Sequence, residues 1–243
     1  MLKKNKAFTL GEALFAVVVI GVIAAFTIPI VMQDSYGRET ILKVKKAYSI
    51  MSNAYERAVA RHGSMIDWNE VNTQIYGDRV VNNVSLGVNC QTRNNLTAVN
   101  DCIPGCPSLY KAKDKTAVNA CTSNNVYKFI AFDGFSYAFQ IEDPDCKIDV
   151  TEGSTVAPLY LKQVCGTAYT DIFNTQKGKN KNLYGQDLFL FYITRDGIIP
   201  TGTDGDKTFP YKEGDCVKSV KTNVFGCTAR VLYGKGALFE KEK

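Results

Sequence analysis

The chain has 243 residues, of which 45% are hydrophobic, 11% aromatic and 22% charged. This length and composition predict one good-sized domain with an extended helix, or two small domains, and they exclude a disordered chain. The formal net charge is +5, but 26 basic and 24 acidic side chains, a net charge of +2, remain without residues 1–7. Because no basic stripe with interleaved aromatic residues occurs, the charge does not indicate a nucleic-acid partner.

The chain begins with a basic segment, MLKKNKA, which an apolar run over residues 13–32 soon follows. A run of this length can cross about 30 Å of hydrocarbon as a helix. Since lysines precede it, the positive-inside rule predicts a single-pass span with the N-terminus in the cytoplasm and the rest outside. Two alternatives stay open: a plain signal anchor, and a cleaved secretory signal with its cleavage site at residues 23–25.

Neither alternative accounts for Glu12, a carboxylate at the head of the apolar run. Such a group costs about 2.5–3.5 kcal/mol at the centre of a membrane helix and less near the interface, so it needs a partner. A cut between Ala7 and Phe8 would create an α-amine on Phe8 that is cationic at neutral pH. Phe8 and Glu12 lie one helical turn apart, so Glu12 can pair with this amine or with that of a neighbouring subunit. Pairing between subunits would set the stagger of stacked helices and offset the cost of burying both charges.

The stretch KNKAFTLGEALFAVVVIGVIAAFTIP resembles the processing and methylation signal of type IV prepilins and type II secretion pseudopilins. The shared features are a short basic leader, a small residue before Phe-Thr-Leu, a glutamate four residues after the phenylalanine, an apolar run and a helix-bending proline. The resemblance implies that a prepilin peptidase cuts after Ala7 and methylates Phe8, that Glu12 directs assembly, and that Pro29 kinks the helix. The chain departs from the usual pattern at Ala7, which replaces a glycine, and at Gly11, which replaces a bulky aliphatic residue.

This resemblance, over residues 1–32, implies a structural subunit of a type IV pilus or a type II secretion pseudopilus. Its partners would be other pilin or pseudopilin subunits, the prepilin peptidase and an inner-membrane assembly platform. The chain would cross the inner membrane once before assembly, with its C-terminal domain outside the cytoplasm, and later form a periplasmic or cell-surface filament. The alternative is an exported disulfide-rich binding protein, such as an adhesin or a lectin, on an ordinary signal sequence.

Residues 33–63 are predicted to continue the N-terminal helix with an amphipathic character. Apolar residues recur there at alternating spacings of three and four, which places them on one helix face. They are Ile41, Val44, Tyr48, Met51, Tyr55 and Ala58. The stripe is too short for a typical coiled coil, so packing against a domain core is favoured. Since Gly63 is a good stop after His62, the helix is expected over residues 8–62, with a kink near Pro29.

The outer domain is predicted to hold an antiparallel sheet. Residues 64–125 are expected to form loops and short elements, and aromatic-rich and aliphatic runs around Gly-containing turns then indicate two hairpins. The runs are 127–132 with 135–141 around Asp133-Gly134, and 188–193 with 198–200 around residues 195–197. Such a sheet would bury one face against the amphipathic helix, so the fold class is α+β and pilin-like.

Four parts of the chain follow from these elements. They are a cleaved basic leader (1–7), a transmembrane and filament-core helix (8–32), its amphipathic continuation (33–63) and an extracytoplasmic disulfide-rich domain (64–243). The last residues of the domain, 228–243, end in charged side chains and are expected to fray.

Eight cysteines, all beyond residue 89, are even in number and contain no Cys-x-x-Cys pair. Since the only histidine, His62, precedes them, they do not indicate a zinc site. An even set in an exported domain indicates disulfides, and four bridges are expected. Many pairings are possible, and sequence neighbours such as Cys216 and Cys227 are one candidate. The cysteines are Cys90, Cys102, Cys106, Cys121, Cys146, Cys165, Cys216 and Cys227.

Two segments rich in oxygen ligands are weighed as calcium sites, although no cofactor is expected. The first weakly resembles a loop that binds calcium in some pseudopilin-like proteins, but three lysines crowd it. The second lacks the ligand spacing of an EF-hand, so a solvated acidic loop is favoured. The first contains Asp171, Asn182, Gly185 and Asp187, and the second Glu142, Asp143, Asp145, Asp149 and Glu152.

An enzyme is not indicated by any motif. His62 is expected at an exposed helix end rather than in a catalytic triad. Neither a Walker A loop nor a dinucleotide-binding glycine pattern occurs in the sequence. A membrane-anchored enzyme based on a pair of carboxylates is therefore the least favoured of the three function classes.

Overall fold

The computed structural model describes residues 10–68, 72–92, 125–173, 185–216 and 224–234. Its contacts divide the chain into two compact units, Met1–Glu39 and Thr40–Lys243. The helices are α1 (Leu10–His62), α2 (Thr73–Val81), α4 (Cys227–Tyr233) and the short 3-10 helices η1 (Met65–Asp67) and η3 (Leu159–Lys162). The strands are β1 (Leu86–Gln91), β2 (Tyr127–Ala131), β3 (Ser136–Ile141), β4 (Val164–Asp171), β5 (Leu188–Thr194) and β6 (Gly197–Pro200). The predicted α+β class, with an apolar N-terminal helix and an antiparallel sheet, is confirmed.

Helix α1 is continuous over 53 residues and runs through both Pro29 and Gly37. Its predicted end is confirmed, because the backbone of Gly63 adopts a φ of 79° and its N–H donates to the Val59 carbonyl at 2.9 Å. Glycine suits this left-handed C-terminal position because it lacks a Cβ atom. The kink at Pro29 stays a prediction.

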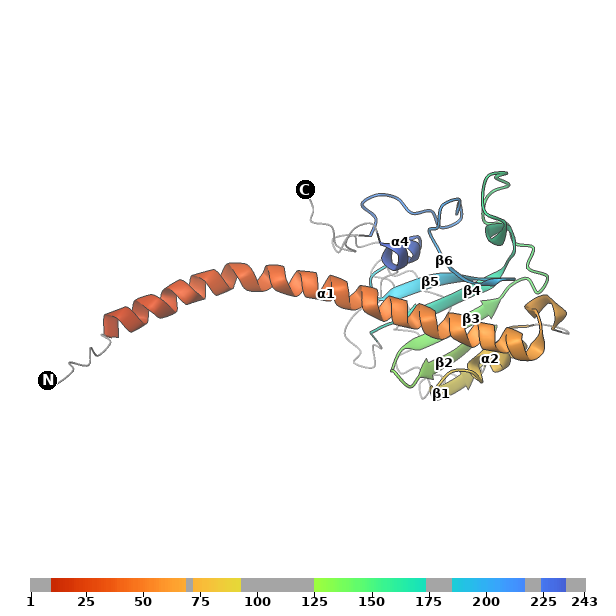
Figure 1. The fold of residues 1–243 in the computed structure, drawn as a ribbon, viewed down its shortest axis with the longest axis horizontal. Helices are drawn as coiled ribbons and strands as arrows, with labels where there is room; N and C mark the ends of the chain where they lie inside the picture. Colours follow the sequence, from red (N-terminus) through yellow and green to blue (C-terminus); the bar gives the residue numbers. More distant parts are fainter. Residues whose placement is uncertain (1–9, 69–71, 93–124, 174–184, 217–223, 235–243) are drawn as a thin grey trace. The chain divides into compact units, whose positions relative to one another are not determined.

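The unit that starts at Thr40 contains a six-stranded antiparallel meander in the order β1-β2-β3-β4-β5-β6 (Figure 1). Both predicted hairpins are confirmed. Strands β2 and β3 pair with Tyr127 opposite Phe139, and β5 and β6 pair up to Thr194 opposite Gly197. Register is fixed because a slip of one residue would turn the aromatic side chains of each strand to the other face.

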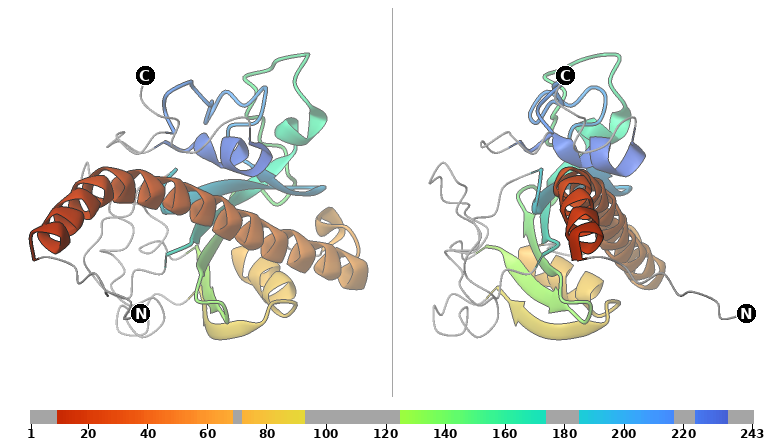
Figure 2. Two further views of the ribbon diagram at one scale, coloured as in Figure 1. Left: turned by 60° about the vertical axis from the view of Figure 1, so that its left-hand side comes forward. Right: turned by 90° about the vertical axis from the view of Figure 1, so that its left-hand side faces the viewer.

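One face of the sheet packs against the 40–62 part of α1, which lies on the same side as α2 and α4 (Figure 2). The Tyr48 ring stacks on Phe191 with centroids 5.9 Å apart, and Tyr55 donates its hydroxyl to the Arg195 carbonyl at 2.6 Å. The stripe predicted on α1 is confirmed, with Ile41 and Tyr48 partly rather than fully buried. The buried members are Val44, Met51, Tyr55 and Ala58, joined by Thr40, Ala47 and Ala54.

The opposite face of the sheet is covered near β4 and β5 by the segments that follow β3 and β6. Val150, Leu161, Val164 and Tyr192 form a buried cluster there, and Phe209 stacks on Tyr192. Covering both faces of β5 explains why all seven of its residues are buried. The sequences of strands that are buried on both faces are continuous apolar runs, without the alternation of apolar and polar residues seen in half-exposed strands.

The chain end departs from the expected fraying over residues 228–233, which belong to helix α4. Thr228 is buried, and its hydroxyl accepts from the Leu190 N–H at 3.2 Å. The Ala229 N–H donates to the Thr201 carbonyl at 2.9 Å. A disulfide from Cys216 to Cys227 ties the first residue of α4 to the preceding loop. The prediction was wrong here because it was based on the charged residues at the end of the chain, and the sequence does not show these tertiary contacts.

Two disulfides join cysteines that both lie within the described residues, Cys146–Cys165 and Cys216–Cys227, and the second is the neighbour pair considered from the sequence. Cys90 is also disulfide-bonded. Closing loops of this length stabilises a domain by about 3 kcal/mol each, mainly through the unfolded state. The other cysteines, Cys102, Cys106 and Cys121, lie outside the described residues.

Replacing Gly77 with alanine is expected to lower the thermal stability of the outer domain. A Cβ atom at Gly77 would collide with the Tyr127 ring, because α2 packs directly on β2 there. The higher helix propensity of alanine stabilises the fold by about 1 kcal/mol, whereas overpacking costs about 1–3 kcal/mol. We therefore expect a net loss of stability. We expect the Tm of the full chain in detergent to fall by roughly 2–6 °C, as measured by circular dichroism. A higher Tm would show that the ring moves aside at little cost.

Candidate functional site

The first candidate site is the apolar surface of α1. One helix among the described residues, Leu10–Ile28, is long and apolar enough to cross a membrane, a criterion that a signal sequence also meets. Its large apolar side chains are exposed on every side of the helix. They are Leu10, Leu14, Phe15, Val17, Val18, Val19, Ile20, Val22, Ile23, Phe26 and Ile28. A helix that is apolar all round needs a surrounding of lipid or of other protein.

Glu12 lies in the first turn of α1, and its side chain belongs to this apolar segment. An acidic group suits a helix N-terminus because the helix dipole is positive there. Ala7 and Phe8, the predicted cleavage and methylation residues, lie outside the described residues. The structure therefore places the carboxylate on the helix, whereas its pairing with the Phe8 amine stays a prediction.

Other polar groups in the apolar segment are satisfied within the helix. Thr27 donates its hydroxyl to the Ile23 carbonyl one turn earlier at 3.0 Å. This bond removes the cost of an unpaired hydroxyl in an apolar surrounding. Around Gly11 and Gly21, a Cβ atom would meet nothing within 4 Å, so neither glycine marks a close internal contact.

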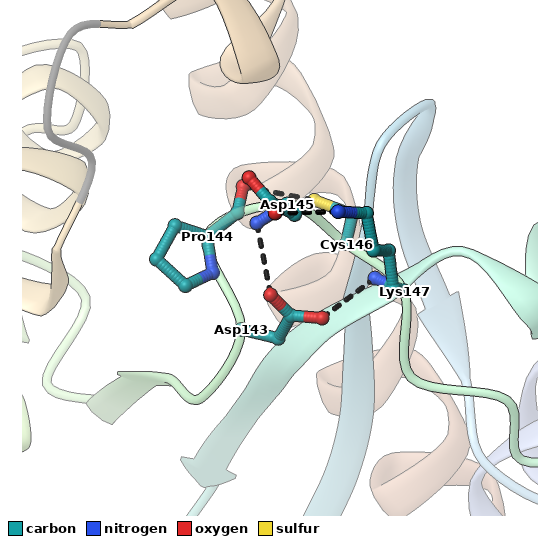
Figure 3. Close-up of polar contacts among 5 residues, drawn as sticks. All are labelled: Asp143, Pro144, Asp145, Cys146 and Lys147. Carbon is teal, nitrogen blue, oxygen red and sulfur yellow. Dashed lines mark hydrogen bonds and ion pairs between the residues drawn. The ribbon is translucent and has the colours of Figure 1, made fainter.

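The acidic segment after β3 uses its carboxylates to shape its own backbone (Figure 3). Asp143 accepts from the Asp145 N–H at 3.0 Å and from the Lys147 N–H at 2.8 Å. The hydrogen bond and charge of Asp145, which lies 2.6 Å from the Lys147 ammonium, raise the pKa of that lysine. Asp149 accepts from the N–H and the hydroxyl of Thr151, and these bonds lower its pKa.

The two candidate calcium loops do not assemble a ligand set within the described residues. No group of three or more His, Cys, Asp or Glu side chains converges anywhere in the described ranges. Asp171 ends β4, is fully buried, and accepts from the Phe173 N–H at 3.0 Å. Gly185 is a turn residue with a φ of 86°, and Asn182 lies outside the described residues.

His62 is the last residue of α1, where the sequence placed it. Its side chain is exposed and meets the Trp68 ring edge-on with centroids 6.2 Å apart. Trp68 in turn donates its indole N–H to the Gly63 carbonyl at 2.9 Å and carries the Arg79 guanidinium over its ring. These contacts pack the helix end against η1 and α2.

A groove beside α1, of about 310 Å³, is the site that sequence reasoning missed. Its walls come from α1, from the segment between α2 and β1, and from the β2–β3 turn. The lining residues are Lys46, Ile50, Asn53, Arg57, Asn83, Val84, Ser85, Ala131, Phe132 and Asp133. Only the α1 members show a pattern in the sequence, since they recur at helical spacing on the side next to the buried stripe.

Comparisons with models of protein families, with curated proteins and with solved structures found no match to this chain. The class that the structure itself defines is an α+β protein with an apolar N-terminal helix, an antiparallel six-stranded sheet and disulfide bonds.

Proposed function

We propose that this chain is a membrane-anchored structural subunit of a type IV pilus or a type II secretion pseudopilus. In this proposal a prepilin peptidase cuts after Ala7 and methylates the Phe8 amine. The apolar helix first crosses the inner membrane and then packs in the core of a filament. No catalytic step is part of the proposal.

The observation that carries the proposal is a glutamate in the first turn of an apolar helix that continues into the outer domain. Helix α1 extends without a break from Leu10 to His62, and one face of its last third is buried on the sheet. An ordinary cleaved signal has no need of such continuity, whereas a filament subunit keeps its apolar helix as part of the mature chain. Glu12 is a costly residue in an apolar helix unless a cationic partner compensates it.

The proposed assembly uses the apolar surface of α1 and the carboxylate of Glu12. The segment up to Ile28 is apolar on all sides, and stacking such helices removes large side chains from lipid or water. Glu12 of one subunit then pairs with the Phe8 amine of a neighbour, which selects one stagger among many that apolar contacts would allow.

The mass of the N-terminal peptide from native, membrane-derived protein tests this proposal. We expect a peptide that begins at Phe8 and is one methyl group heavier than its sequence mass. A peptide that begins near Phe26 would instead identify a secreted protein that has lost Glu12 with its signal, and the filament proposal would then be withdrawn.

A further inference from the structure

The groove beside α1 combines an apolar floor with a basic rim. Ile50, Val84 and Phe132 supply apolar surface, and the Phe132 side chain is 84% exposed although it is large and aromatic. Lys46 lies 3.3 Å from Asp133, while Arg57 has no ion pair within the described part of the chain. Over residues 40–62 the helix carries five Lys or Arg residues and one acidic residue, a formal charge of +4 without His62.

The loop of residues 142–163 between β3 and β4 has the opposite character. It carries five acidic residues and two lysines, a formal net charge of −3. Its tip exposes two apolar side chains, Val156 at 92% and Leu159 at 66%. Together these two side chains form a small exposed apolar patch at the loop tip.

The base of this loop is held firmly, so the tip is presented in a defined place. The Cys146–Cys165 disulfide joins the loop to the start of β4. The Val150 N–H donates to the Leu161 carbonyl at 3.0 Å, and the Lys207 N–H donates to the Val150 carbonyl at 2.8 Å. A preorganised tip loses little conformational entropy when it binds.

We infer that, in the filament of the proposed function, the tip of the 142–163 loop of one copy occupies the groove beside α1 of the next copy. Val156 and Leu159 pack against Ile50 and Phe132. Glu152 of the loop faces Arg57 at the rim. The groove volume lies at the lower end of the roughly 300–1,000 Å³ typical of binding pockets, which suits a few side chains rather than a large ligand.

The groove and the loop are different surfaces of the chain, so a contact between them can repeat from one copy to the next. The groove lies at the β2–β3 turn, whereas the loop leaves β3 after Ile141 at the other end of that strand (Figure 1). Six residues of strand separate these ends by about 17 Å. Contacts between two different patches of identical subunits repeat from copy to copy and generate filaments unless the rotation closes a ring.

A photo-cross-linker at the loop tip tests this contact in the full-length chain in its native membranes. Val156 is replaced by p-benzoylphenylalanine, and unlabelled and isotope-labelled copies are mixed before irradiation. We expect a covalent dimer in which residue 156 of one copy is joined to the peptide containing Phe132 or Ile50 of another. A cross-link to a different protein, or to another surface of a second copy, would overturn the inference.

Charge variants give the matched control. Arg57→Glu is expected to lower the cross-linked fraction roughly five- to tenfold by placing like charges together, whereas Arg61→Glu, one turn further along α1 and outside the groove, should change it less than about twofold. Combining Arg57→Glu with Glu152→Arg should restore the cross-link, which a mere loss of folding would not allow. Failure of this restoration would contradict the assigned pair.

The same samples separate this inference from the proposed function. Methylated Phe8 and recoverable filaments without the groove cross-link would overturn the inference alone. A groove cross-link in chains that start near Phe26 would keep the contact between copies and overturn the proposed function. If neither filaments nor the cross-link form, both proposals fail.

Discussion

Replacing Glu12 with glutamine is expected to leave the chain in the membrane and to stop its assembly into filaments. Glutamine keeps the size and the polar end of the side chain but removes its charge. In the proposed filament, the methylated Phe8 amine of the neighbour would then stay buried without its counter-charge. Removing one partner of a buried ion pair costs about 3–5 kcal/mol, which corresponds to a loss of roughly a hundredfold or more in assembly.

Filaments sheared from cells and the chain left in the membrane fraction are the two quantities to measure. Thr27→Val is the matched control, since it also alters one polar group of the apolar helix. Because the Thr27 hydroxyl bonds only to its own helix at Ile23, its removal should leave the filament yield unchanged. Normal filaments from Glu12→Gln would contradict charge pairing as the device that sets the stagger.

The elements that were predictable from sequence carry their signal locally. The length of α1 follows from an apolar run, an unbroken stripe at helical spacing and a glycine stop after His62. The two hairpins follow from short Gly-containing turns between aromatic or aliphatic runs. In each case neighbouring residues decide the outcome, and the structure agrees with them.

Strand β4 shows why other elements were missed. Its sequence, VCGTAYTD, mixes small and polar residues and lacks a clear period, yet it lies between β3 and β5 with most of its side chains buried. Gly166 is required there, because a Cβ atom would collide with the Gln140 carbonyl of β3. This requirement comes from a strand far away in the sequence, so no local pattern contains it.

The groove beside α1 is hidden from sequence reasoning for the same reason. Lys46 and Arg57 appear as ordinary charges on the solvent side of a helix. Their meaning changes only when the fold brings the β2–β3 turn, with the exposed Phe132, beside them. Likewise, the acidic residues after β3 appear as a solvated loop until the exposure of Val156 marks an apolar tip among them.

Raising the pH above about 10 is expected to unfold the outer domain cooperatively. Five of its tyrosines, Tyr55, Tyr76, Tyr127, Tyr137 and Tyr192, are at most 3% exposed. Burial raises the pKa of each hydroxyl, to about 12 for Tyr55 and Tyr127. Nearby carboxylates add to this effect, since Asp206 accepts the Tyr192 hydroxyl at 3.0 Å and Asp133 lies near Tyr137.

The direction in which stability changes with pH follows from the number of protons that each state binds. Above pH 10 the unfolded chain loses these phenolic protons, whereas the folded domain keeps them, so the folded state binds more protons and its stability falls as pH rises. Below pH 10 both states keep the protons, and the stabilisation is complete. Five such groups together lower the free energy of unfolding by about 7 kcal/mol over one pH unit, which is comparable with the total stability of about 5–15 kcal/mol typical of a domain. Unfolding is therefore expected at about pH 11–12.

Tyrosinate absorbance and far-ultraviolet circular dichroism, recorded together against pH and on back-titration, check this expectation. The buried tyrosines should ionise only as the fold is lost, so their part of the absorbance change should coincide with the loss of secondary structure. Tyr192→Phe should release one proton fewer in the transition and so flatten the fall of stability with pH by about a fifth. If all tyrosines instead ionise near pH 10 while the circular dichroism is unchanged, then the hydroxyls reach solvent in the folded domain, and burial does not link its stability to alkaline pH.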